Sequence, residues 1–522
     1  MPRISGILNR LPIARRVYRI GKRLLANRND VRLWFTGVDA AFEGHHLQNY
    51  PGDYTSRIQS PWPQPSPHDP QGLAPTVLHV PVVEIEEFLD TVVARYLRTL
   101  KREWPLALLE SWQNPGLEPV SLAEFTRMLT ESSFSRFLNP QLDEVDRGIF
   151  AAWIARRPKA RLFKVDLGAL ALAETLPGLK LHPSVTLLER HEDGRFEPLV
   201  IRLAGICHEP GDGESWLAAQ YFVLNGCANL LVISAHPRVH FPFDTINAVT
   251  KTILPQDHPL ARLLLPHCYL QLPLNFAVLY IDRSVAHNHQ TEIYTPFAVT
   301  RKGFIALMKA GYSGIPGNSS YPRYHYQAGG MKVHSPYGQF LARYYEVFER
   351  FAARVLASVK ADDEAVIRWA DAIAAQLPGF PSSKEIFESV GEGKSSHLIA
   401  AAATFMHNCS VVHSADHHLY ARESIRQIPL RLRAEPPRAR HSRVSKRAGW
   451  LRRSDHFRHF MANRMYFKTN TLRALTAVRY GLESGSELVA EAVFFDELRE
   501  LDRDPEMCRF VPLKEIACSI QY

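Results

Sequence analysis

The segment that decides the fold is Leu398-Ile-Ala-Ala-Ala-Ala-Thr-Phe-Met406, which leads through Cys409 into His413-Ser-Ala-Asp-His417. A stretch that is apolar on every side predicts a central helix buried in a large protein. Histidines four positions apart lie on one face of a helix, one turn apart, and can aim both imidazoles at a common point. The segment therefore predicts a helix that carries a histidine pair into the interior.

A second pair with the same spacing, His236-Pro-Arg-Val-His240, follows the apolar stretch from Ala228 to Ala235. Burying an imidazole without a partner costs roughly 2 kcal/mol or more, and a shared metal ion removes that cost. Neutral imidazole suits iron, zinc or copper, whereas an added carboxylate and an open position favour redox-active iron over closed structural zinc. The terminal carboxylate of Tyr522 is the expected fifth donor, so the sequence predicts an iron site.

The rest of the chain is mainly helical by its hydrophobic periodicity. Two strand-like stretches, Leu162–Leu167 and Pro198–Leu203, interrupt this pattern. Periods near 3.6 predict the helices, at 83–104, 216–236, 340–359, 365–377, 395–420 and 484–501. We expect a catalytic domain over residues 161–522, and an N-terminal helical or irregular region over residues 1–160 that packs on it.

Composition restricts the class of protein. Of 522 residues, 46% are hydrophobic and 22% charged, as in a globular protein rather than a disordered one. The longest apolar stretches fall short of the roughly 18 residues that span a bilayer, so no membrane crossing is predicted. Six scattered cysteines without C-x-x-C spacing and the lack of a secretory signal favour the cytoplasm.

Positive charge is concentrated in two places. The net charge of +9 draws on a basic leader, residues 1–33, with interleaved apolar residues, and on a second arginine cluster at 431–453. The leader is typical either of a solvated basic segment or of an interfacial helix that contacts an anionic membrane. Neither cluster has the interleaved aromatic residues of a single-strand binder, so no nucleic-acid partner is expected.

Several motifs in order resemble the catalytic domain of lipoxygenases, the non-haem iron dioxygenases. Trp216-Leu-Ala-Ala-Gln resembles the family's W-L-A-K element, and His258-Pro-Leu-Ala-Arg-Leu-Leu-Leu-Pro-His267 resembles its H-P-x-x-x-L-L-x-P-H. The second histidine pair looks like the animal-type H-x-x-x-H pattern, and the closing Ile516-Ala-Cys-Ser-Ile-Gln-Tyr522 is similar to the family's tail. The resemblance covers about residues 160–522 and implies a large helical domain with small β elements. Nothing resembles the N-terminal lipid-binding PLAT β-barrel.

Carried over by position, the resemblance implies His240, His413, His417 and the carboxylate of Tyr522 as iron ligands, with manganese as an alternative metal. The family spaces its first two ligands five residues apart across a π-bulge, which would put the first at Ala235. His236 stands one place later. Four-residue spacing faces one metal in an ordinary α-helix, so His236 replaces the missing ligand if the bulge is absent. Pro237 predicts a kink there.

Further residues follow from the same resemblance. His258, Asn229 and Tyr420 are candidates for orienting the ligands through hydrogen bonds, although an ordinary packing or capping role is the simpler explanation for each of them. Tyr420 stands where the family usually has glutamine. The expected apolar substrate cavity is lined by Leu264, Leu265, Phe276, Ala286 and Phe405.

The implied reaction is hydrogen abstraction from the methylene between two cis double bonds of a polyunsaturated fatty acid, followed by capture of O2 to give a hydroperoxide. Two alternatives remain open. One is an iron-dependent oxidase of another unsaturated or phenolic metabolite on the same scaffold, favoured by Tyr420 and His236. The other is a metal-free protein that binds membrane surfaces or nucleic acid, favoured by the two arginine clusters.

Overall fold

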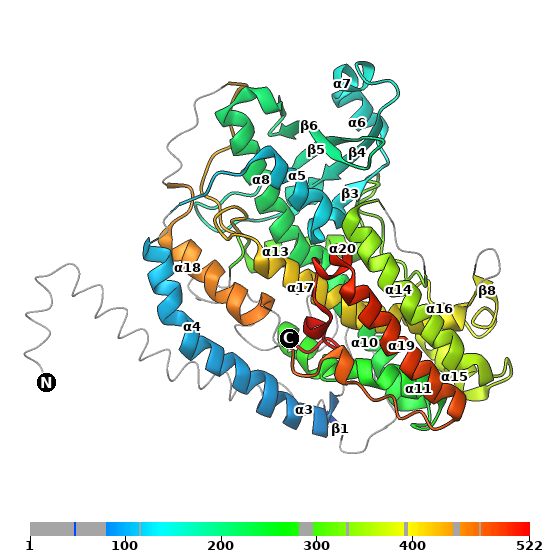
Figure 1. The fold of residues 1–522 in the computed structure, drawn as a ribbon. Coiled ribbons are helices and arrows are strands. Elements are labelled where there is room, and N and C mark those ends of the chain that lie inside the picture. Colours follow the sequence, from blue (N-terminus) through cyan, green and yellow to red (C-terminus); the bar gives the residue numbers. More distant parts are fainter. Residues whose placement is uncertain are drawn as a thin grey trace, which may run out of the picture.

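The computed structural model describes residues 46–47, 80–113, 116–280, 296–329, 334–390, 395–441, 449–468 and 471–522. The basic leader, the position of Ala286 and part of the second arginine cluster lie outside these residues. Helices make up most of the described chain, and a small sheet lies at one end (Figure 1). The mainly helical class with small β elements is therefore confirmed.

Two long central helices contain the histidine pairs. The first runs through α8 (Glu214–Leu230), a π-helical turn (Leu231–Ala235), α9 (Pro237–His240) and α10 (Pro242–Ile253). The second runs through α16 (His397–His407), a π-helical turn (Asn408–Val412) and α17 (His413–Arg422). Both are buried along most of their length, and α9 packs against the π-helical turn of the second helix. This packing brings the two histidine-bearing segments face to face.

The first central helix is long and apolar enough, over Glu214–Ile253, to cross a membrane, but 89% of its most apolar window is buried inside the protein. This burial is that of a core helix. Its apolar surface is covered by the other helices of the same chain rather than left for lipid.

Other helices surround this central pair. α14 packs against both α16 and α19, and α4 packs against α18 along the edge of the molecule (Figure 1). Their bounds are α3 (Val82–Phe88), α4 (Ala94–Gln113), α5 (Leu122–Glu131), α6 (Glu144–Ile149), α7 (Ala151–Ala155), α11 (Pro259–Leu264), α12 (Gln271–Tyr280), α13 (Arg301–Ser313), α14 (Pro336–Val355), α15 (Glu364–Ala374), α18 (Arg453–Ala462), α19 (Gly485–Arg503) and α20 (Pro505–Cys508). The predicted helical segments of the catalytic region are all found among them and the central pair.

The sheet is an antiparallel meander of five strands in sequence order. Its strands are β3 (Leu138–Asn139), β4 (Arg161–Asp166), β5 (Ser184–Arg190), β6 (Phe196–Leu203) and β7 (Ile206–His208). The register between β5 and β6 shifts at Leu187/Leu188, next to Pro198, which has no N–H for the ladder. Two-stranded pairs join β1 (His46–Leu47) to β2 (Val80–Pro81) and β8 (Ser389–Val390) to β9 (Ser395–Ser396). Both strand-like stretches of the sequence are strands.

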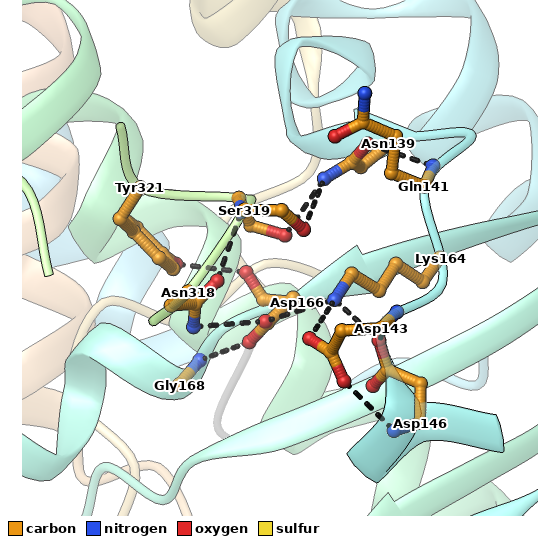
Figure 2. Close-up of polar contacts among 11 residues, drawn as sticks. Asn139, Gln141, Asp143, Asp146, Lys164, Asp166, Gly168, Asn318, Ser319 and Tyr321 are labelled. Atoms are coloured by element: carbon orange, nitrogen blue, oxygen red, sulfur yellow. Dashed lines mark hydrogen bonds and ion pairs between the residues drawn. The ribbon is translucent and has the colours of Figure 1, made fainter. Parts of the chain in front are cut away.

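A buried lysine fastens the sheet to the helices (Figure 2). The Lys164 side chain is fully buried, and its Nζ lies 2.5 Å from Asp146 and 3.2 Å from Asp143, both at the start of α6. Its third carboxylate neighbour, Asp166, accepts a hydrogen bond of 3.1 Å from Asn318, which lies beyond α13. The charged network therefore connects β4 to α6 through Lys164, and to the loop that follows α13 through Asp166.

Lys164→Met should lower the free energy of unfolding by about 3 to 5 kcal/mol, because it leaves the buried carboxylates without their cation. Urea denaturation measures the loss. Arg195→Met is the matched control, since the Arg195–Asp193 pair lies in the turn between β5 and β6 and both side chains are exposed, and it should leave the urea midpoint unchanged. A Lys164→Met protein that unfolds at the wild-type urea concentration would contradict the structural role of the network.

Candidate metal centre

Four imidazoles meet between the two central helices. The potential ligand atoms of His236, His240, His413 and His417 all lie within 4.8 Å of one another, and all four side chains are buried. His236 Nε2 lies 2.8 Å from His240 Nε2 and 3.0 Å from His417 Nε2. The ring centroid of His413 lies 4.8 Å from that of His240 and 4.5 Å from that of His417. The structure thus brings together all four histidines that the sequence singles out.

The backbone that presents each pair contains a π-helical turn directly before the first histidine. The His236 N–H donates to Leu231 O at 2.7 Å, five residues back. A bulge is therefore present, but it ends at Ala235 and does not separate His236 from His240, so the four-residue spacing between them is that of an ordinary α-helix, as expected. Pro237 follows at once, and the widened turn accommodates a residue that has no N–H to donate. From Pro237 to His240 the helix is an ordinary α-helix, so both rings face the same point.

The four residues fit a metal ion by their spacing. Adjacent ligands at about 2.1 Å from one ion lie about 3 Å apart, which is the separation of His236 Nε2 from the Nε2 atoms of His240 and His417. Within the described part of the chain, neither ring nitrogen of the buried His413 has a hydrogen-bond partner. Buried polar groups are nearly always paired, so these orphaned nitrogens also favour a shared ion.

The electrostatics keep the imidazoles neutral, which is the form that binds metals. Burial lowers the pKa of His240 to about 4 and that of His417 to about 3. Burial, followed by the neighbouring imidazoles, lowers the pKa of His236 and His413 well below the usual range. At neutral pH, each ring therefore has a nitrogen lone pair available for a metal ion.

Two of the rings are oriented by hydrogen bonds at Nδ1, whereas Nε2 faces the cluster. His236 Nδ1 lies 2.9 Å from Asp416 Oδ2, and His240 Nδ1 lies 2.8 Å from Asn275 Oδ1. Asn275 in turn donates to Asp244, whose pKa burial raises well above its ordinary value. Because Nδ1–H donates in both rings, Nε2 is left as the acceptor atom that faces the cluster.

Asp416 is itself enclosed. Its Oδ1 accepts a hydrogen bond of 3.0 Å from the Tyr337 hydroxyl and lies 2.9 Å from Nη2 of Arg136. Burial raises the pKa of Asp416, while Arg136 and Tyr337 act in the opposite direction by favouring the ionised carboxylate.

The last residue of the sequence, Tyr522, is buried beside the histidines. Its ring centroid lies 5.1 Å from that of His413 and 5.0 Å from that of His417. Its hydroxyl donates to Ser414 Oγ at 3.1 Å. Just before it, the Gln521 side chain accepts hydrogen bonds from the backbone N–H groups of Leu472 and Arg473. The tail is therefore fixed in the interior, next to the second histidine pair.

The three candidates for orienting the ligands have other contacts in the described part of the chain. His258 caps α11 by accepting from Leu260 N, and its Nε2 lies 3.2 Å from Asp363. Asn229 ties the first central helix to the backbone at Leu430 and Ala298. Tyr420 pairs with His459 at 3.1 Å, and its ring packs against Phe467, whose own ring lies 6.0 Å from that of His417.

The residues expected around a substrate cavity lie partly outside the described side chains. Leu264 and Phe405 are fully buried in the main hydrophobic core, and Leu265 packs against it. Phe276 lies in α12, and Ala286 lies outside the described residues. Their position along a substrate cavity stays a prediction.

Sequence reasoning missed Asp416, Arg136, Tyr337 and Asn275. Asp416 carried a signal, because a charged residue directly before His417 on a buried helix needs a partner. Arg136, Tyr337 and Asn275 come from three other segments, so no spacing in the sequence connects them to the histidines. Only the tertiary structure reveals their contacts.

No protein-family model and no curated protein matches the chain. Solved structures do match it. The fold is that of lipoxygenase catalytic domains. A LOX designated delta413-417:GS, solved anaerobically in complex with arachidonate, matches with a TM-score of 0.64 at 14% identity, over 84% of this chain and 75% of that one. Coral 8R-lipoxygenase matches with a TM-score of 0.61 at 14% identity, over 91% and 79% of the two chains.

A fungal lipoxygenase from Fusarium graminearum gives a similar result, with a TM-score of 0.59 at 15% identity over 77% of this chain and 80% of that one. Identity this low shows a lipoxygenase-like fold and not a shared activity. Within that fold, the histidine cluster is a group of side chains that could hold a metal ion.

Stability of the metal-free protein should depend on pH through the buried imidazoles. Unfolded imidazole titrates near pH 6.5, whereas burial lowers the pKa of His240 to about 4, so the unfolded chain binds more protons between these values. The free energy of unfolding therefore falls as the pH drops below about 6.5, by about 3 kcal/mol through His240 alone on reaching pH 4.

Urea denaturation of chelator-treated protein between neutral and acidic pH measures this dependence. His240→Gln, which cannot titrate, should lose less stability over the same interval than wild type. Parallel pH profiles for the two proteins would contradict the burial of a neutral His240.

Proposed function

We propose that the chain is a lipoxygenase-type dioxygenase that uses one non-haem iron ion to insert O2 into a polyunsaturated fatty acid. The observation that carries the proposal is the convergence of four buried imidazoles between the central helices of a lipoxygenase-like fold. Nitrogen donors of this kind accept iron or manganese, and iron is the metal whose redox chemistry the reaction needs.

The chain's own groups have defined tasks in this proposal. His236, His240, His413 and His417 are the imidazole ligands, and the terminal carboxylate of Tyr522 is the fifth donor. Bound iron supplies the one-electron oxidant for hydrogen abstraction from the methylene between two cis double bonds. An anionic donor favours the higher oxidation state. The buried Tyr522 ring lies beside His413, so the residue that carries this carboxylate is next to the cluster.

The substrate class rests on a neighbour and on the chain's apolar surroundings. A similar LOX has been solved with arachidonate. We assign this chain a substrate with the same chemical feature, a cis,cis-pentadiene in an acyl chain, bound against Leu264, Leu265, Phe276, Ala286 and Phe405. Leu264 and Phe405 lie in the same apolar core as the central helices, so apolar side chains of the kind that contact an acyl chain lie in the part of the fold that holds the cluster. Molecular oxygen is the second substrate.

One observation favours a different substrate on the same scaffold. Tyr420, one turn beyond His417, forms a buried hydrogen bond with His459 at a position where the family usually has glutamine. A polar pair near the site is compatible with an iron-dependent oxidase of another unsaturated or phenolic metabolite.

The proposed location is the cytoplasm, with contact to an anionic membrane through residues 1–33, which lie outside the described residues.

Purified protein should contain about one iron per chain and should consume O2 with linoleate or arachidonate, with a rise in conjugated-diene absorbance. His413→Ala should abolish both metal content and O2 uptake, because it removes a ligand from the centre of the cluster. Elemental analysis and an oxygen electrode measure the two results. His418→Ala is the matched control: this neighbouring histidine pairs with Glu515 instead, at 2.7 Å, and its loss should change neither result.

Other outcomes separate the alternatives. Iron-containing protein that leaves both fatty acids unreacted favours the oxidase of another metabolite. Protein without iron or O2 uptake refutes the dioxygenase. Salt-dependent binding to anionic vesicles or DNA that is indifferent to His413→Ala favours the metal-free binding protein.

A further inference from the structure

Asp416 lies at the centre of a buried contact network that ends on one histidine of the cluster. It stands one residue before His417 on α17 and is 2% exposed. One oxygen faces His236 Nδ1 at 2.9 Å, and the other faces the Tyr337 hydroxyl and the Arg136 guanidinium. Both oxygens of the carboxylate are therefore engaged, one toward the cluster and one away from it.

The groups of this network come from four separate parts of the fold. Arg136 lies in a short 3₁₀ turn (Ser133–Phe137), Tyr337 in the first turn of α14, Asp416 on the second central helix and His236 on the first. The carboxylate thus joins the two central helices directly across the cluster. Tyr337 and Arg136 fix the carboxylate itself, since each contacts the oxygen that does not face His236.

His236 differs from the other three histidines in this respect. The ring of His240 is held by the neutral amide of Asn275, and neither ring nitrogen of His413 has a partner in the described part of the chain. His236 alone among the four has a carboxylate at its Nδ1 within that part. A carboxylate behind an imidazole fixes the Nδ1–H tautomer, orients the ring and strengthens Nε2 as a donor.

His236 is also the histidine that departs from the lipoxygenase pattern by one position. The π-helical turn before it and Pro237 after it rotate the chain, and the direction of the imidazole then depends on what contacts its other nitrogen. Asp416 makes that contact, and its direction leaves Nε2 facing His240 and His417 at 2.8 and 3.0 Å.

We propose that Asp416, held by Arg136 and Tyr337, is the positioning residue that makes the displaced His236 a metal ligand. The inference rests on the proposed metal site and deepens it. Asp416 acts through His236 and does not itself touch the metal. Its loss should therefore weaken metal binding only while His236 is present.

The test is a double-mutant cycle on metal affinity rather than on activity. Metal-free wild type, Asp416→Asn, His236→Gln and the double variant are titrated with Co²⁺, and dissociation constants and visible absorption spectra are recorded. Asparagine keeps an oxygen that accepts the Nδ1–H but removes the charge. Asp416→Asn should weaken binding by about 10- to 100-fold in the wild-type background and change the Co²⁺ spectrum. In the His236→Gln background, the further loss should be less than about threefold.

Glu515→Gln is the matched control, because it removes the charge from another histidine–carboxylate pair, in which Glu515 faces His418, the residue that follows His417 on α17. It should leave Co²⁺ affinity and spectrum as in wild type. If Asp416→Asn does not fold, as judged by its thermal melt, Tyr337→Phe takes its place in the cycle. That variant keeps both charges and should weaken binding by about threefold, again only with His236 present.

The outcomes separate this inference from the proposed function. Unchanged affinity in Asp416→Asn, or equal losses with and without His236, would overturn the positioning role while leaving the metal site intact. Wild-type protein that binds no Co²⁺ or iron would overturn both.

Discussion

The structure depends on the burial of four imidazoles at one point between two helices. Each ring loses its water on burial, and two neutral imidazoles can satisfy only one hydrogen bond between them. His413 has no hydrogen-bond partner for either ring nitrogen within the described residues, although it is fully buried. An ion that accepted all four lone pairs would offset this cost and would let the two central helices meet at a polar point inside an apolar core.

Imidazoles from two separate helices must face one point, and this requirement explains backbone features that otherwise look unfavourable. Both central helices widen into a π-helical turn directly before the first histidine of a pair, at Leu231–Ala235 and at Asn408–Val412. Such turns lose regular hydrogen bonding and are frequent at functional sites. Here each one sets the direction of the α-helical turn that follows, so that rings from two separate helices face one another. The same widening accommodates Pro237 inside the first helix.

The helical class, the strands of the small sheet and the two histidine-bearing helices could be predicted from the sequence, because periodicity and four-residue spacing are local properties. The bulge before His236 could not, since the sequence of Leu231–Ala235 is that of any buried helix. The Asp416 network could not be predicted either, because Arg136 and Tyr337 lie far from Asp416 in the sequence. His258 and Asn229 show why proximity to a motif in sequence does not define a site: their described contacts cap a helix and hold backbone segments, which is the ordinary role also expected for each of them.

The central claim is that the four imidazoles bind one metal ion. Anomalous diffraction at the iron absorption edge, from crystals of protein purified without added metal, tests this most directly. The account predicts one anomalous peak within bonding distance of His236, His240, His413 and His417. A peak bound elsewhere on the protein, or four well-ordered imidazoles with no peak between them, would contradict it.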